Sequence, residues 1–212
     1  MDRNLGATSA TPGEAGALGL LYQWGRKDPF LGSSSISSNV EAKSTISWPS
    51  PVSSSSSRGT IGYAVEHPTT FITLNDSNYD WYYTGSSSTD DTRWQSEKTI
   101  YDPCPAGWRV PDGDSNGVWD KAGFDFQSYD SSNEGMLFGS GISSPATWYP
   151  ASGFRSYDDV SLRGVGYSGY YWSVTPGSGA GACSLFVYYN GYVFPTSIGS
   201  RAYGRSVRCL QE

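Results

Sequence analysis

The segment from Gly164 to Arg208 is built largely from three residue types, because it contains seven Tyr, seven Ser and nine Gly. Tyr combines a large, rigid face with a polar tip at low entropic cost, and Ser and Gly adapt around it, which is the composition of antibody paratopes. The segment has no Lys, Asp, Gln, His or Met, so it offers few of the titratable groups that catalysis needs. These features predict a recognition surface rather than an active site.

The composition of the whole chain favours a globular domain with many loops. Of the 212 residues, 37% are hydrophobic and 16% are charged, with 26 Gly and 12 Pro. The low charge argues against a highly charged disordered chain, and eight Trp and 16 Tyr supply bulk for a core. Runs such as Ser53 to Ser57 indicate solvated loops. We therefore predict one domain, residues 1–212, of short strands, few helices and long Ser/Gly-rich loops.

Charge excludes one class of partner. The net charge is −6, and the basic residues of 160–211 are four Arg without Lys, which is not the basic stripe of a nucleic-acid-binding protein.

No stretch has the ~20 apolar residues of a membrane span. Residues 1–4 lack the basic and apolar regions of a secretory signal, so we expect any signal or anchor to lie outside this chain.

Three Cys are present, so at least one stays without an intramolecular partner. Cys104 lies between two Pro residues and Cys209 near the C-terminal end. A disulfide between them would join the end of the chain to its middle and suit an extracellular protein. The alternative is two buried free thiols. In either case Cys183 is the odd residue.

Period-2 patterns and turn signals predict the local structure around the Tyr-rich segment. Strands are expected at 69–74, around Trp108 and Val110, and at 146–155, 169–174 and 204–210, with a short helix at 118–124 capped by Asn116 or Ser115. Asn190-Gly191 predicts a hairpin. The expected core positions are Trp172, Leu185, Val187, Val193 and Val207. The expected ligand-binding positions, which point outward or lie in loops, are Phe186, Tyr188, Tyr189, Asn190, Tyr192, Phe194, Ser197, Ile198, Ser200 and Tyr203.

We further predict that Tyr188, Tyr189, Tyr192, Phe194 and Tyr203 form one contiguous, mostly exposed patch, because the two arms of the hairpin meet on one face. The alternative is a second packed layer beneath the Ser-rich loops, since Tyr is only intermediate in burial.

Five segments spread along the chain resemble the Fibrobacter succinogenes major paralogous domain, a surface-protein family common in Bacteroidetes. They are 1–7 (MDRNLGA), 22–30 (YQWGRKDPF), 102–111 (DPCPAGWRVP), 169–173 (GYYWS) and 201–209 (RAYGRSVRC). That family is similar to the C-type lectin-like fold. The resemblance implies an α+β domain whose terminal strands meet, on a secreted or surface-anchored protein of a fimbrial or adhesive assembly.

Some C-type lectin-like proteins are diversified by retroelements that mutate adenines, mainly in AAC codons, which never yields Lys, Glu, Gln, Met or Trp. Residues 173–208 contain none of these five types. The resemblance therefore suggests a retroelement-diversified variable protein, with about residues 164–208 as its variable region. The alternative is an ordinary Tyr/Ser-rich β surface.

Other site motifs are incomplete. Asp112 to Gly117 matches the first half of a calcium loop, and Asp120 suits its ninth position, but the twelfth position is Gly123 instead of a carboxylate. We therefore expect an acidic turn and no metal or other cofactor. The Glu-Pro-Asn, Gln-Pro-Asp and Trp-Asn-Asp motifs of sugar-binding C-type lectins are absent. His67 is the only His and is expected at the surface.

Three functions remain compatible with these residues. The first is non-catalytic binding of a protein or glycan ligand, as an adhesin or receptor-binding domain at the surface of a bacterium or phage. The second is a structural tip or cap of a fimbrial assembly. The third, a formylglycine-generating type of oxidase, would need Cys183 and Cys209 as its reactive pair, and we expect no enzymatic activity.

Overall fold

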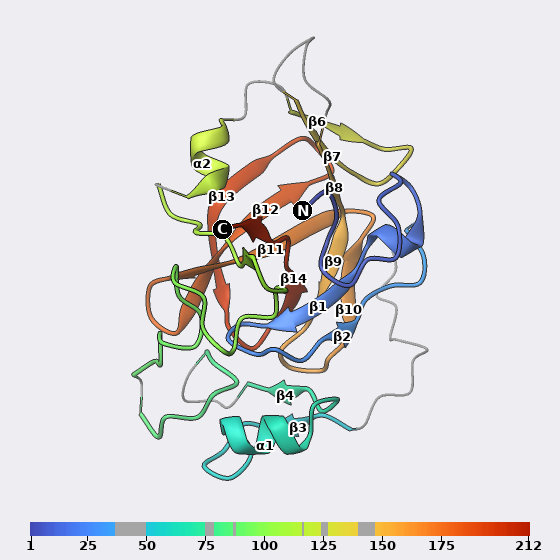
Figure 1. Cartoon of the computed structure of the whole chain (residues 1–212). Helices are drawn as coiled ribbons and strands as arrows, with labels where there is room; N and C mark the ends of the chain where they lie inside the picture. Colours follow the sequence, from blue (N-terminus) through green and yellow to red (C-terminus); the bar gives the residue numbers. More distant parts are fainter. Residues whose placement is uncertain (37–49, 75–78, 87, 116, 124–126, 140–146) are drawn as a thin grey trace.

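The computed structural model describes residues 1–36, 50–74, 79–86, 88–115, 117–123, 127–139 and 147–212 (Figure 1). Strands dominate this part of the chain. The α-helices α1 (Ile61–Glu66) and α2 (Val118–Ala122) are short, and a 3-10 helix, η1 (Ala15–Ala17), precedes the first strand. At this coarse level the fold is α+β with an excess of β structure, as predicted.

The central element is an eight-stranded sheet with the order β13-β12-β11-β9-β14-β1-β2, in which β10 also pairs with β9. Its strands come from both ends of the chain, since β1 pairs with β14 and Leu21 lies opposite Ser206. β9 and β11 run parallel, with Gly153 opposite Gly169. The strands are β1 (Leu20–Gln23), β2 (Phe30–Leu31), β9 (Ser152–Arg155), β10 (Leu162–Val165), β11 (Ser168–Pro176), β12 (Gly181–Tyr188), β13 (Val193–Ser200) and β14 (Gly204–Ser206).

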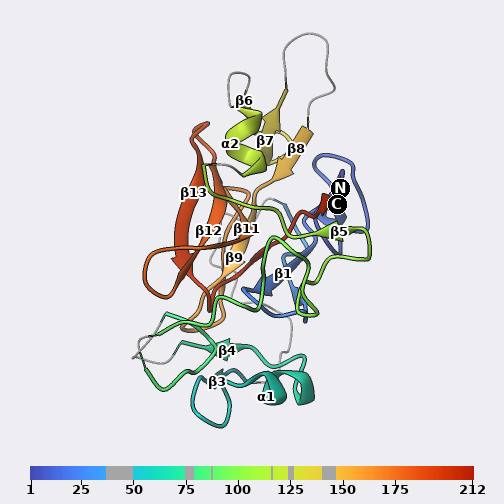
Figure 2. The same cartoon turned by 60° about the vertical axis from the view of Figure 1, so that its left-hand side comes forward.

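Three smaller sheets surround the large one. β3 (Val52–Ser53) pairs with β4 (Ile72–Thr73), and β5 (Trp108–Arg109) with β15 (Leu210–Gln211). The third contains β6 (Gln127–Asp130), β7 (Gly135–Phe138) and β8 (Thr147–Pro150). Both views place α2 and β6–β8 at one end of the molecule and α1, β3 and β4 at the other (Figures 1 and 2).

Two of the apolar clusters pack against β11 and β12 of the large sheet. One gathers Trp24, Trp94 and Trp172, all fully buried, around the disulfide. The other joins β12 to α2 and β7 through contacts among Trp119, Met136, Tyr171, Leu185 and Val187. The core positions predicted at Trp172, Leu185, Val187 and Val207 are all at 0% exposure, whereas Val193 is only half-buried at the edge of the second cluster.

The predicted disulfide between Cys104 and Cys209 is present, with the two Cα atoms 5.9 Å apart. It excludes the alternative of two free thiols, and Cys183 is the free, buried cysteine. The chain ends also meet nearby, because the amino group of Met1 donates a hydrogen bond to the carbonyl of Cys209. Figure 2 shows both ends on one side of the molecule and β13 on the other.

Three predicted strands are shorter or interrupted in the structure. In 69–74 only Ile72 and Thr73 pair with β3, because the chain before them turns with a hydrogen bond from Thr70 N–H to the His67 carbonyl. The segment 146–155 contains two strands of different sheets, β8 and β9, separated at Ala151. The segment 204–210 leaves the large sheet after Ser206, and Leu210 then pairs with Arg109. Long-range pairing decides each boundary.

The helix predicted at 118–124 exists but ends at Ala122, and its predicted cap is wrong. Gly117 is the N-cap residue, without a side-chain hydrogen bond, so Ser115 does not cap the helix. Asn116 lies outside the described residues. Gly123 stops the helix with a φ of 68°, a conformation that Gly adopts without steric cost.

Candidate functional site

The hairpin predicted at Asn190-Gly191 joins β12 to β13. Val187 lies opposite Val193, and the N–H of Tyr188 donates to the carbonyl of Tyr192 over 2.9 Å. Gly191 has a φ of 88°, which favours Gly at this turn. The Asn190 side-chain oxygen accepts a hydrogen bond from the Tyr192 N–H. The sequence therefore places the turn correctly.

Alternation along β12 separates its aromatic residues from its core residues. Leu185 and Val187 enter the cluster with Trp119 and Met136. Phe186 and Tyr188 project from the opposite side, where the Phe186 ring stacks on Phe194 of β13 with centroids 5.8 Å apart. One side of the hairpin is therefore buried and the other is aromatic.

Ten aromatic rings continue this side as one connected row, which we call the aromatic strip. Each ring centroid lies 4.0–6.2 Å from that of a neighbouring member. The strip crosses the sheet from β13 through β12 and β11 to β9 and the start of β14. Its members are Phe154, Tyr157, Tyr167, Tyr170, Phe186, Tyr188, Tyr189, Tyr192, Phe194 and Tyr203.

The strip is most exposed at the tip of the hairpin. Tyr189, Tyr192 and Phe194 are 44%, 61% and 51% exposed, whereas Tyr188 and Tyr203 are half-buried. Tyr203 packs on Tyr157 and Phe154, with centroids 4.7 and 5.2 Å away. The five residues of the predicted patch thus belong to one row of rings, but Tyr203 lies at its far end and is joined to the others through rings of β9 and β11.

Four of the strip's members are not among the site residues predicted from sequence: Phe154, Tyr157, Tyr167 and Tyr170. Tyr167 and Tyr170 belong to the Tyr-rich segment, which is a usable signal. Phe154 and Tyr157 join the strip because β9 pairs in parallel with β11. No local sequence pattern predicts this pairing.

Two predicted site residues lie elsewhere. Ser200 is buried, because its hydroxyl donates to the Tyr79 carbonyl over 2.8 Å and accepts from the Ala202 N–H. Ile198 is exposed but pairs with Cys183, on the side of β12 that carries Leu185. A register shift between the Phe186–Phe194 and Ser184–Ser197 pairs, a β-bulge in β13, breaks the alternation assumed from sequence. Ser197, opposite Ser184, is half-buried, and Asn190 is exposed at the turn.

Arg205 of β14 lies beneath the middle of the strip. Its side chain is 5% exposed, and its guanidinium carbon is 4.6 Å from the ring centroid of Tyr170 and 5.0 Å from that of Tyr203. The ring centroid of Trp172 lies 4.4 Å from the same guanidinium carbon. Burial lowers the pKa of this guanidinium to about 10, so it remains protonated at neutral pH. Arg205 is not among the site residues predicted from the sequence.

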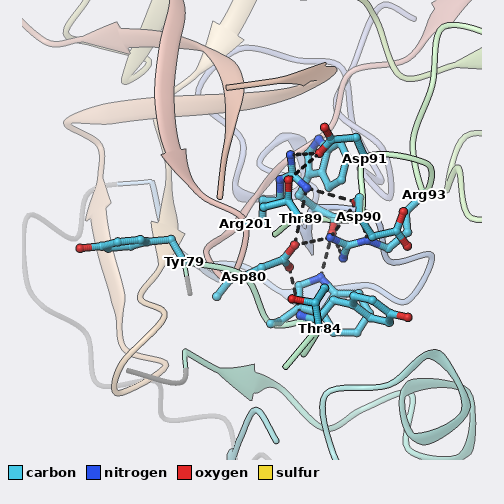
Figure 3. Close-up of polar contacts among 12 residues, drawn as sticks. Tyr79, Asp80, Thr84, Thr89, Asp90, Asp91, Arg93 and Arg201 are labelled. Atoms are coloured by element: carbon cyan, nitrogen blue, oxygen red, sulfur yellow. Dashed lines mark hydrogen bonds and ion pairs between the residues drawn. The ribbon is translucent and has the colours of Figure 1, made fainter. Parts of the chain in front are cut away.

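A buried ion cluster lies at the base of the hairpin, and Figure 3 shows the side chains of Asp80, Asp91, Arg93 and Arg201 converging on one another. Arg93 pairs with Asp80, and the Nη1 of Arg201 lies 3.6 Å from the same carboxylate. All three side chains are at most 1% exposed. Arg201 also pairs with the half-exposed Asp91 and lies 4.1 Å over the Trp24 ring. The cluster fixes Asp80, Asp91 and Arg93 to Arg201, in the turn between β13 and β14.

The acidic turn at Asp112 lies beside a cavity of about 630 Å³ whose walls include Trp94, Asp112 and Val174. The Asp112 carboxylate accepts hydrogen bonds from Ser96 and from Arg109, the latter over 2.7 Å. Partial burial raises the pKa of this carboxyl, but these hydrogen bonds and the charge of Arg109 lower it overall. No group of three or more potential metal-ligating side chains occurs among the described residues.

No protein-family model matches this chain, and neither the curated proteins nor the solved structures give a match. We therefore infer function from the geometry above and from the sequence motifs.

The cysteines also bear on the oxidase hypothesis. Cys209 is bonded to Cys104, so it is not available as the partner of Cys183. Burial, with a smaller contribution from Asp114, raises the pKa of the Cys183 thiol and so disfavours the reactive thiolate.

His67 is exposed at the end of α1, against the Tyr63 ring, as expected for a surface residue. None of the helices in the described ranges has the length and apolar character of a membrane span.

Proposed function

We propose that this chain is a non-catalytic ligand-binding domain of a bacterial or phage surface protein, and that the aromatic strip binds its ligand. The observation that carries the proposal is the exposure of Tyr189, Tyr192 and Phe194 at the open end of a continuous row of rings. Contiguous exposed apolar surface on a folded domain marks an interaction site, and buried aromatic anchors dominate the energy of such interfaces.

Two features support a C-type lectin-like framework and an extracellular location. The resemblance implies terminal strands that meet, and here β1 pairs with β14 while Met1 donates to Cys209. The Cys104–Cys209 disulfide is typical of oxidising compartments. Both features agree with an adhesin or receptor-binding domain exported to the cell surface.

The first experiment replaces the exposed end of the strip. In the triple variant Tyr189→Ala, Tyr192→Ala and Phe194→Ala, we expect each change to alter the free energy of unfolding by only about 0.5 kcal/mol, because exposed side chains contribute little to stability. Ligand binding should fall by at least about 30-fold per anchor, which corresponds to about 2 kcal/mol. Thermal melting gives the stability, and titration of a ligand found on protein and glycan arrays gives the affinity.

Tyr79→Ala is the matched control, because Tyr79 is 63% exposed and no ring contact joins it to the strip among the described residues. It should leave both stability and binding unchanged. A strip variant that melts far below the wild type would show that the rings are a packed layer of the fold. A stable strip variant with unchanged binding would show that the ligand binds elsewhere on the domain. If no ligand binds on the protein and glycan arrays, the fimbrial tip or cap would be the favoured function.

Retroelement diversification is a separate part of the proposal, and neighbouring DNA tests it. We expect a near-copy of the codons for about residues 164–208 that differs only at adenines and lies beside a reverse transcriptase gene. A genome without such a copy would leave an ordinary ligand-binding surface.

A further inference from the structure

Arg205 has less compensation for its charge than the buried residues Arg93, Arg201 and Arg208. Arg93 and Arg201 pair with Asp80, and Arg208 donates to the carbonyls of Met1, Asp2 and Trp148. In the described part of the chain, Arg205 has one hydrogen bond, from Nη1 to the Ser184 hydroxyl over 2.8 Å. Its Nε is buried without a hydrogen-bond partner, and no described carboxylate lies within 4 Å of its nitrogens.

A buried cation without a counter-ion costs stability. Contact with three rings offsets part of this cost, because the negative face of an aromatic ring attracts a cation. The fold thus keeps a positive charge beneath the strip where an apolar side chain would fill the same space. A group that costs stability and lies at a candidate site points to function.

The other charges around the strip do not neutralise its centre. Arg163 pairs with Asp158 and Asp159 near the Tyr203 end, where all three side chains are at least 38% exposed. Such charges are screened by salt. No residue from 186 to 194 is charged. A buried charge next to low-dielectric rings acts over a longer distance than a solvated one, so Arg205 makes the middle of the strip more attractive to an anion.

Resting on the proposed function, we propose that the ligand is a protein that places an Asp or Glu side chain, flanked by apolar residues, over the Tyr170–Phe186 part of the strip. Burial raises the pKa of the Tyr170 and Tyr203 phenols, and the Arg205 guanidinium that lies against both rings opposes this rise. Both hydroxyls therefore stay protonated at neutral pH and can donate hydrogen bonds to a carboxylate. A protein partner fits the surface because aromatic residues are enriched, and charged ones depleted, at the centre of protein interfaces. The Tyr, Ser and Gly composition fits it too.

The probe is a random 12-residue peptide library displayed on phage and selected against the wild-type domain. We expect the enriched peptides to be rich in Asp and Glu. A synthetic copy of the best peptide should bind about tenfold more tightly than the same peptide with each Asp replaced by Asn and each Glu by Gln. We expect only this modest difference in affinity because the charge contact is indirect. The difference should shrink as salt is added, because ions screen the attraction.

Two variants of Arg205 attribute the preference to this residue. Arg205→Met should fold at least as stably as the wild type, since apolar replacement of a poorly compensated buried charge is often stabilising, and should bind acidic and amide peptides equally. Arg205→Lys keeps the charge and should keep the preference. If Arg205→Met fails to fold, the acid-to-amide comparison on the wild type still decides whether the partner is acidic. The same comparison on Arg205→Lys then decides whether a positive charge at this position is enough for the preference.

Different outcomes test the acidic partner and the strip as the binding site. Enriched peptides that lose affinity for the triple strip variant, but bind equally as acid and amide, would overturn the acidic partner and keep the strip as the site. Peptides that bind the triple strip variant as tightly as the wild type would overturn the proposed function. A preference retained in Arg205→Met would also overturn the role of Arg205.

Discussion

Replacing Asp80 by Ala should lower the free energy of unfolding by about 3–5 kcal/mol, because the change leaves charged groups buried without their partner. Asp80 is 1% exposed and is the carboxylate that Arg93 and Arg201 share. Both guanidinium groups are also buried, against the Trp24 ring. Chemical denaturation with urea measures the loss. The slope of the free energy of unfolding against urea concentration should stay unchanged if the variant folds as the wild type does.

Asp91→Ala is the control within the same cluster. Asp91 pairs with Arg201 but its side chain is 50% exposed, and such pairs contribute only about 0–1 kcal/mol. Asp80→Asn should lie between the two, since it keeps the shape and loses the charge. Equal losses for Asp80→Ala and Asp91→Ala would contradict the role of the cluster as the anchor of the hairpin.

Removing the disulfide by Cys104→Ala and Cys209→Ala should cost about 2–5 kcal/mol, because the bridge limits the freedom of the unfolded chain. The two residues are 105 positions apart in the sequence, and a closed loop of that size corresponds to about 4.7 kcal/mol in the chain-entropy model. Both cysteines lie in the Trp24, Trp94 and Trp172 cluster, so their loss also removes apolar contacts.

Melting with and without a reducing agent measures the contribution of the disulfide, and Cys183→Ala is its control. Cys183 is buried but unbridged, so its replacement should cost about 1 kcal/mol, the usual effect of a point mutation, and leave the response to reductant intact. A wild-type protein whose melting temperature does not change on reduction would show that the bridge adds little to stability.

The sequence predicts the features that depend on neighbouring residues. The hairpin follows from Asn190-Gly191 and the alternation around it, and the cores at Leu185 and Val187 follow from the same pattern. The Cys104–Cys209 bridge follows from the setting of the two residues in the sequence. In each case a local signal is enough, because the relevant contacts are few or the residue type is rare.

Features that depend on distant segments could not be predicted. The burial of Ser200 results from the bulge in β13 and from the carbonyl of Tyr79, 121 residues away. Phe154 joins the strip through the parallel contact between β9 and β11. Arg205 is one Arg among several in the sequence, and the uncompensated state of its buried guanidinium becomes visible only when its surroundings are assembled.

The placement of both chain ends opposite β13 has a practical consequence (Figure 2). A carrier protein, bead or sensor surface attached through either terminus would lie behind the domain, so the aromatic rings would face the solution. Ends that are close together also suit insertion into a loop of another protein. The molecule is therefore well suited to immobilisation in a defined orientation, and a library randomised at positions 189, 192 and 194 could be displayed without the carrier covering the varied residues.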